Sequence, residues 1–138
     1  MKNILMSFFV FFILLFSFGY SLGERSEDLK KPCNNLNGII GDCFTFEGRP
    51  SLFNGNPSLR IWRIGTKRIL GVHEIINETT GEEPCIPENL KKAINDNFSI
   101  EVYGEFTVCP LTKAEPGVMQ MVCVDSVKIT KVVNLDNK

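Results

Sequence analysis

The sequence has few of the residues that build metal sites and most catalytic sites. Its 138 residues include one histidine, His73, and none of its five cysteines are spaced as C-x-x-C, the arrangement of many zinc and redox motifs. A zinc site would therefore need mostly thiolate ligands. We predict no metal ion and no cofactor, and we favour a domain that is not an enzyme.

Long hydrophobic runs are also lacking, apart from one at the N-terminus. Residues 4–18 are almost entirely apolar, but these roughly 15 residues are fewer than the roughly 20 that a permanent membrane-spanning helix needs. Lys2 precedes the run, and small residues that suit signal peptidase follow it up to Ser21 and Gly23. We predict that residues 1–23 are a secretory signal peptide; the alternative is an uncleaved N-terminal anchor.

The sequence also lacks an excess of positive charge. From Glu24 onward, 14 lysines and arginines stand against 16 aspartates and glutamates, so the net charge is about −2. This balance argues against a general attraction to nucleic acid or to an anionic membrane. The remaining chain suffices for one domain, which we expect to be a monomer. Polar sequence without periodicity predicts a flexible lead-in at 24–38, followed by the domain at 39–138.

What the chain does contain is a series of short β-type runs separated by glycine and proline. Residues 100–108 are the clearest, because apolar and polar side chains alternate there with a period of two. Inward-facing Gly104 predicts a tight bend or a close neighbour, and a slip in the apolar phase at Asp125-Ser126 predicts a bulge. Other strands are predicted at 43–53, 59–64, 67–72 and 118–133, a loop at 73–86, and a short helix at 87–97.

The order strand, strand, strand, helix, strand, strand is that of an OB-fold. We therefore predict a mainly β domain, a five-stranded OB-like barrel with one short capping helix, stapled by disulfides. A two-layer α+β sandwich is the alternative.

All five cysteines follow the predicted signal, and export favours disulfides. Cys109 and Cys123 share the outer phase of two strands joined as a hairpin, so we predict a Cys109–Cys123 bridge. A second bridge, Cys43–Cys85, would tie the first strand to the loop before the helix, with Cys33–Cys85 as its main rival. Cys33 is then left as a free thiol.

Two stretches of the chain resemble a known group of proteins. They are residues 43–72, which begin Cys-Phe-Thr-Phe-Glu-Gly-Arg-Pro, and the later pair at 104–110 and 119–124. Over residues 40–130 the chain resembles a family of small exported bacterial proteins with no assigned activity. The resemblance implies an OB-like barrel and a location in the bacterial cell envelope, periplasmic or secreted. It assigns no functional residues.

The segment from 49 to 68 is the most basic part of the exported chain. The second and third strands of an OB-fold form its usual ligand platform, where aromatic rings stack on bases or sugars and arginines hold anions. The alternative is that Trp62 supports the barrel wall and the basic residues form a solvated face. We predict a ligand-binding face made of Arg49, Phe53, Arg60, Trp62, Arg63, Lys67 and Arg68.

Together these features favour an exported, non-enzymatic binding domain of the cell envelope, whose partner is an unknown protein or an anionic glycan rather than nucleic acid. Two other functions stay open. One is a secreted hydrolase that uses acidic residues such as Glu101 and Glu105, or His73 as a general base. The other is a disulfide-rich protein inhibitor that inserts its N-terminal segment into an enzyme, which requires Cys33 to be bridged.

Overall fold

The computed structural model describes residues 31–94 and 99–137, and the predicted signal peptide at 1–23 lies outside these ranges. Within them, no helix is long and apolar enough to cross a membrane. In chain order the elements are the 3-10 helix η2 (Pro32–Asn35), β1 (Phe44–Leu52), β2 (Leu59–Arg63), β3 (Ile69–Val72), β4 (Glu74–Asn77), β5 (Gly81–Pro84), α2 (Glu88–Ile94), β6 (Ile100–Pro110), β7 (Gln120–Asn134) and the 3-10 helix η3 (Leu135–Asn137).

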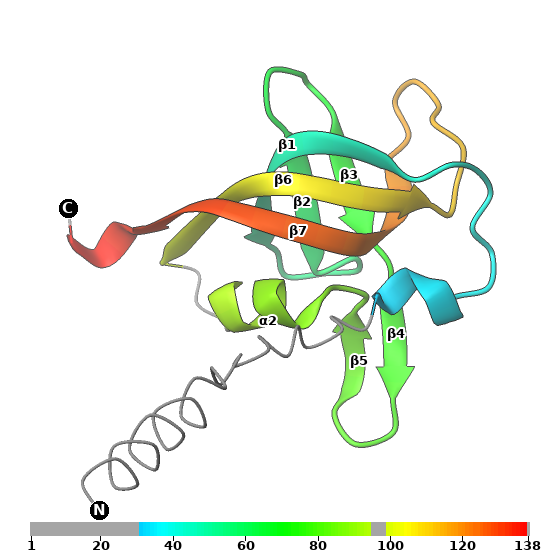
Figure 1. Cartoon of the computed structure of the whole chain (residues 1–138), viewed down its shortest axis with the longest axis horizontal. Coiled ribbons are helices and arrows are strands. Elements are labelled where there is room, and N and C mark those ends of the chain that lie inside the picture. Colours follow the sequence, from blue (N-terminus) through cyan, green and yellow to red (C-terminus); the bar gives the residue numbers. More distant parts are fainter. Residues whose placement is uncertain (1–30, 95–98, 138) are drawn as a thin grey trace, which may run out of the picture.

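Five of the strands form a closed ring in the order β1-β2-β3-β7-β6, in which β6 returns to pair with β1 (Figure 1). Neighbouring strands are antiparallel except β3 and β7, which run parallel. Closing the sheet on itself removes the unpaired edges that a flat sheet would expose. The predicted class, a mainly β domain with a five-stranded closed sheet and one short helix, is therefore confirmed, and the chain does not adopt the two-layer sandwich.

The core lies inside this ring and is closed at one end by α2. Period-two alternation along β6 points Val102, Phe106 and Val108 inward, and all three are fully buried. Leu90 and Ile94, one helical turn apart on α2, join the same cluster of buried side chains. Figure 1 shows α2 lying against the ring from below, beneath β6 and β7.

The bulge expected in the last strand is present. Val108 pairs with Val124 and Thr107 pairs with Ser126, so Asp125 is an extra residue on β7. The extra residue places Asp125 under the N-terminal segment, with only 8% of its surface exposed.

Gly104 has the close neighbour that its inward position predicted. A Cβ at this residue would lie 2.7 Å from the carbonyl oxygen of Lys128 on β7. Only glycine lets β6 and β7 approach this closely, because the obstructing atom belongs to the backbone and cannot swing away.

The loop predicted at 73–86 is wrong, because most of it forms the β4–β5 hairpin. This hairpin projects away from the ring beside η2 (Figure 1). Ile75 and Ile76 are adjacent and both exposed, so the segment shows none of the alternation that marks a half-buried strand. Its turn is held by Asn77, whose Oδ1 accepts hydrogen bonds from the backbone N–H groups of Thr79 and Thr80.

Two further boundaries differ from the prediction. The helix at 87–97 is observed as Glu88–Ile94, and residues 95–98 are outside the described ranges. The lead-in at 24–38 is ordered where it is described, since η2 buries Cys33 against β7. The folded domain therefore includes residues 31–38, ahead of the boundary predicted at 39.

Candidate functional site

Trp62 lies on the outside of the ring, at the centre of the predicted ligand face. Ile61 points into the core, so the alternation of β2 turns Trp62 outward. Across the strands it faces Arg49 on β1 and Ile69 on β3, and the Arg49 guanidinium carbon is 5.5 Å from the indole centroid. Its Nε1 donates a hydrogen bond of 2.8 Å to the carbonyl oxygen of Thr66, which leaves the half-buried ring fixed and its remaining face available.

A second pairing of a cation with an aromatic ring joins β2 to the residue that follows β1. Arg60 also points outward from β2, and its guanidinium carbon is 4.5 Å from the ring centroid of Phe53. Phe53 follows β1 and is 40% exposed. Stacked guanidinium and ring surfaces of this kind offer both apolar area and charge to one ligand.

Two of the predicted arginines are already occupied. Arg49 Nη1 is 2.6 Å from Glu101 Oε1 on β6, and the hydroxyl of Tyr103 donates to the other oxygen of that carboxylate. Arg63 lies apart from the outer face, because it pairs with inward-facing Gly48 and stands over the ring of Phe46. These contacts neutralise Arg49 and hold Arg63 over Phe46 rather than on the outer face.

Lys67 and Arg68, in contrast, are exposed in the β2–β3 turn. Neither makes an ion pair within the described ranges. They line an open hollow of about 480 Å³ together with Ile69 and the loop at 114–119, in which Val118 is also exposed. The free positive charges of the predicted site are therefore Arg60, Lys67 and Arg68, beside apolar surface.

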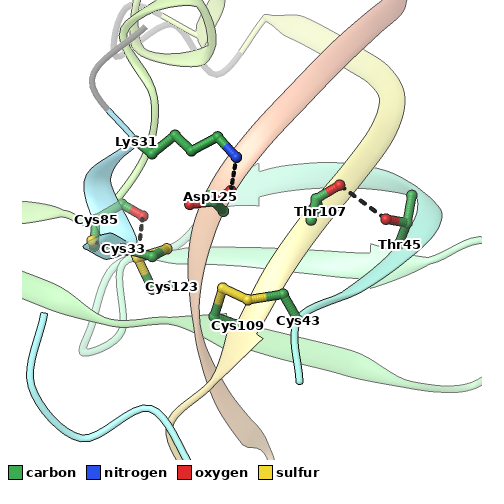
Figure 2. Close-up of a disulfide and its surroundings, with 9 residues drawn as sticks. All are labelled: Lys31, Cys33, Cys43, Thr45, Cys85, Thr107, Cys109, Cys123 and Asp125. Carbon is green, nitrogen blue, oxygen red and sulfur yellow. Dashed lines mark hydrogen bonds and ion pairs between the residues drawn. A yellow bond between two sulfur atoms is a disulfide. The ribbon is translucent and has the colours of Figure 1, made fainter. Parts of the chain in front are cut away.

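The disulfides differ from the prediction at every position. Cys33 is bonded to Cys123 and Cys43 is bonded to Cys109, whereas Cys85 carries the free thiol (Figure 2). Cys109 and Cys123 do lie opposite each other in the β6–β7 register, as expected. However, β1 pairs with the other edge of β6, which sets Cys43 beside Cys109 as well, and η2 lays Cys33 on Cys123.

The free thiol is part of a buried cluster of sulfur atoms. Cys85 is 1% exposed, and its Sγ lies 2.8 Å from the Sγ of Cys123. Burial raises the pKa of the Cys85 thiol to about 11, because the apolar surroundings disfavour the thiolate. The sulfurs of Cys33, Cys85 and Cys123 lie within 4.8 Å of one another, but two of them are joined in a disulfide, so this oxidised cluster offers one thiol and not the ligand set of a metal site.

The two disulfides also hold both ends of an exposed loop. Cys33 and Cys43 bracket residues 34–42, which are exposed except for half-buried Leu36, and each bracketing cysteine is bonded to a different strand of the ring. Ile40 is 52% exposed, while its backbone N–H donates a 2.9 Å hydrogen bond to the carbonyl oxygen of Pro110. The predicted pairing left Cys33 as a free thiol and so did not define this loop, although the inhibitor alternative required Cys33 to be bridged.

The residues considered for hydrolysis have other roles where the structure describes them. His73 donates its backbone N–H to Val122 and accepts from Cys85, and within the described ranges its ring makes no hydrogen bond. Glu101 is held by Arg49, and Glu105 lies opposite Lys128 on the solvated face. No hydrogen bond or ion pair in the described part of the chain joins His73 to either glutamate.

Comparisons of the chain with protein-family models, with curated proteins and with solved structures found no match.

Proposed function

We propose that this protein is a small exported, non-enzymatic binding domain of OB type, which holds an anionic glycan on the outer face of β1, β2 and β3. The observation that carries the proposal is the position of Trp62. Its outward-facing indole lies opposite Arg49 on β1 and is held by a hydrogen bond to the carbonyl oxygen of Thr66, and aromatic rings in such positions stack on sugar rings.

Charge supports an acidic ligand at this face. Lys67 and Arg68 are exposed without carboxylate partners in the described part of the chain, and Arg60 is stacked on Phe53 rather than paired with an acid. The exported chain as a whole is slightly acidic, so these unpaired cations form a local patch and not a general positive surface.

Export is the second part of the proposal, with the bacterial cell envelope as the location. The two disulfides are compatible with a periplasmic or extracellular compartment, since such bonds form and persist in oxidising surroundings. The signal-peptide pattern at 1–23 supplies the route.

The binding test uses retention on immobilised anionic polysaccharides, with heparin for sulfates, alginate for carboxylates and neutral dextran as the blank. We expect the protein to be retained by at least one anionic matrix and released by salt. Trp62→Ala is expected to weaken binding about tenfold or more, since stacking contributes about 1–3 kcal/mol per ring. Lys67→Ala/Arg68→Ala is expected to weaken it and to flatten its salt dependence.

A charge-matched control separates this face from general electrostatics. Lys128→Ala/Lys131→Ala removes two positive charges from β7 and should leave retention unchanged. Far-UV circular dichroism confirms that every variant is folded. If Trp62→Ala and Lys67→Ala/Arg68→Ala bind like the wild type, or if the β7 variant loses as much affinity as they do, the proposal is wrong.

A protein inhibitor is the second candidate, and one observation favours it. Residues 34–42 form an exposed loop fastened at both ends by disulfides, and Cys33 is bridged as that hypothesis requires. A loop held in one conformation binds an enzyme cleft at a low entropic cost. Ile39 and Ile40 are its exposed apolar side chains.

The inhibitor hypothesis is tested by measuring hydrolysis of labelled casein by an envelope extract, with and without the protein. Inhibition that Ile39→Ser/Ile40→Ser abolishes and Trp62→Ala preserves would favour the loop over the β1–β2–β3 face. Absence of inhibition at micromolar protein would eliminate this candidate without affecting the glycan test.

A further inference from the structure

The free thiol of Cys85 lies against a disulfide. Its Sγ is 2.8 Å from Sγ of Cys123, which is bonded to Cys33 (Figure 2). All three cysteines are at most 2% exposed and share one buried cluster. Thiol–disulfide exchange requires a thiol that can reach one sulfur of a disulfide, and this contact supplies that arrangement within a single chain.

The backbone holds Cys85 and Cys123 more firmly than it holds Cys33. Cys123 lies inside β7, paired with Cys109. Cys85 is fixed beside it, because its N–H donates 2.7 Å to the carbonyl oxygen of His73 and its own carbonyl accepts 3.1 Å from Val124. Cys33, in contrast, belongs to the one-turn helix η2 outside the sheet. Cys33 is therefore the sulfur best able to leave.

We propose that Cys33, Cys85 and Cys123 form an internal exchange site, in which Cys85 displaces Cys33 from Cys123 and makes Cys33 a thiol open to modification. The Cys85 thiolate attacks Sγ of Cys123, the Cys85–Cys123 bond forms as the Cys33–Cys123 bond breaks, and Cys33 leaves as a thiolate. The proton lost by Cys85 is regained from water at Cys33. One disulfide and one thiol are present before and after, so no oxidant or reductant is consumed.

The exchange changes what the N-terminal segment presents. In the described form the loop at 34–42 is fastened through Cys33 and through Cys43. After exchange only the Cys43–Cys109 bond remains at its ends, and η2 is held by weaker contacts such as the ion pair of Lys31 with Asp125 at 3.3 Å. Cys33 then becomes accessible to electrophiles and to disulfides of other molecules. This inference does not depend on the glycan face.

The test is to alkylate the native oxidised protein with N-ethylmaleimide at pH 8, quench with acid and map the cysteines without reduction. Trypsin combined with an Asp-specific protease leaves each of the five cysteines on its own peptide. We expect the label on Cys33, together with a Cys85–Cys123 linked pair of peptides. The Cys43–Cys109 pair should stay intact and serves as the internal control.

The matched variant is Cys85→Ser, with Cys85→Ala as the alternative if the buried hydroxyl prevents folding. Either variant should remain unlabelled with Cys33–Cys123 intact, because no attacking thiol is left. A label found on Cys85 of the wild type, with Cys33–Cys123 intact, would overturn the proposal. So would a native wild type that takes up no label over hours in which the urea-unfolded protein is labelled to one equivalent.

Discussion

At the residue scale, the thiol of Cys85 determines how fast the proposed exchange can run. Only the thiolate attacks a disulfide, and burial raises the pKa of this thiol to about 11. The titratable residues on the segments around it include Asp125 on β7 with Lys31 beside it, His73 and Glu74 at the start of the β4–β5 hairpin, and Glu82 and Glu83 on β5. At neutral pH the thiolate is therefore scarce.

We predict that the rate of alkylation at Cys33 rises about tenfold per pH unit between pH 7 and 10, as expected for a thiol far below its pKa. The measurement uses iodoacetamide at concentrations where the rate no longer depends on reagent, so that exchange is the slow step. A rate that levels off by pH 9 would show a thiol that titrates like an exposed one and would contradict the buried setting of Cys85.

The raised pKa of the Cys85 thiol also makes the stability of the folded protein depend on pH. The pKa of this thiol is near 9.0 when the chain is unfolded and about 11 when it is folded and buried. The unfolded state therefore binds fewer protons than the folded state between these values. The stabilising contribution of the neutral thiol is complete below pH 9 and is lost as the pH rises toward 11.

The disulfide pattern shows where residue-level prediction fails. The outer phase and the facing positions of Cys109 and Cys123 follow from alternation along two adjacent strands, and both are observed. The bonds themselves depend on two further neighbours. Closure of the ring sets Cys43 on the other side of Cys109, and η2 covers Cys123. Hydrophobic alternation and cysteine spacing predict neither contact. The predicted closed barrel does imply that Cys43 lies near Cys109, but nothing in the sequence places η2 on Cys123.

At the scale of elements, α2 depends on docking for its existence. A helix of seven residues is too short to be stable alone in water. Leu90 is fully buried under the ring, and Ile94 is 9% exposed beside it. The hydrophobic face therefore supplies the stability that the short backbone cannot.

We predict that Leu90→Ala lowers the free energy of unfolding by about 2–5 kcal/mol, through lost burial and the cavity left behind. Lys92→Ala, on the exposed side of the same helix, should change it by no more than about 0.5 kcal/mol. Urea unfolding followed by Trp62 fluorescence measures both. Equal, small effects would mean that α2 does not close the core.

The β4–β5 hairpin is an element that hydrophobic periodicity does not predict. β4 and β5 are exposed along much of their length and pack few side chains, so no hydrophobic period identifies them. Their register is set instead by backbone pairing and by the Asn77 turn. The five strands of the ring, in contrast, each bury one face, and the sequence pattern predicts their ends to within one or two residues.

At the scale of the whole molecule, the Cys43–Cys109 bond joins residues 66 apart in sequence across the β1–β6 closure. A cross-link over a loop of this length stabilises by about 4 kcal/mol in the chain-entropy model, because it restricts the unfolded chain. This bond shares no sulfur atom with the proposed exchange site of Cys33, Cys85 and Cys123. It can therefore be removed without removing the exchange site.

We predict that Cys43→Ala/Cys109→Ala lowers the free energy of unfolding by about 4 kcal/mol, measured at pH 6 to prevent disulfide reshuffling. Cys85→Ala, which removes a buried thiol but no cross-link, should cost about 1 kcal/mol. A loss from the double variant no larger than that from Cys85→Ala would show that the bond does not restrict the unfolded chain.

The strand order of the ring determines how much of the chain must be synthesised before the ring can close. As the chain emerges from a ribosome, residues 44–72 can pair only as the meander β1–β2–β3. The outer edges of that meander wait for β6 and β7, which are the last strands to appear. The ring therefore cannot close before residues 120–134 are present.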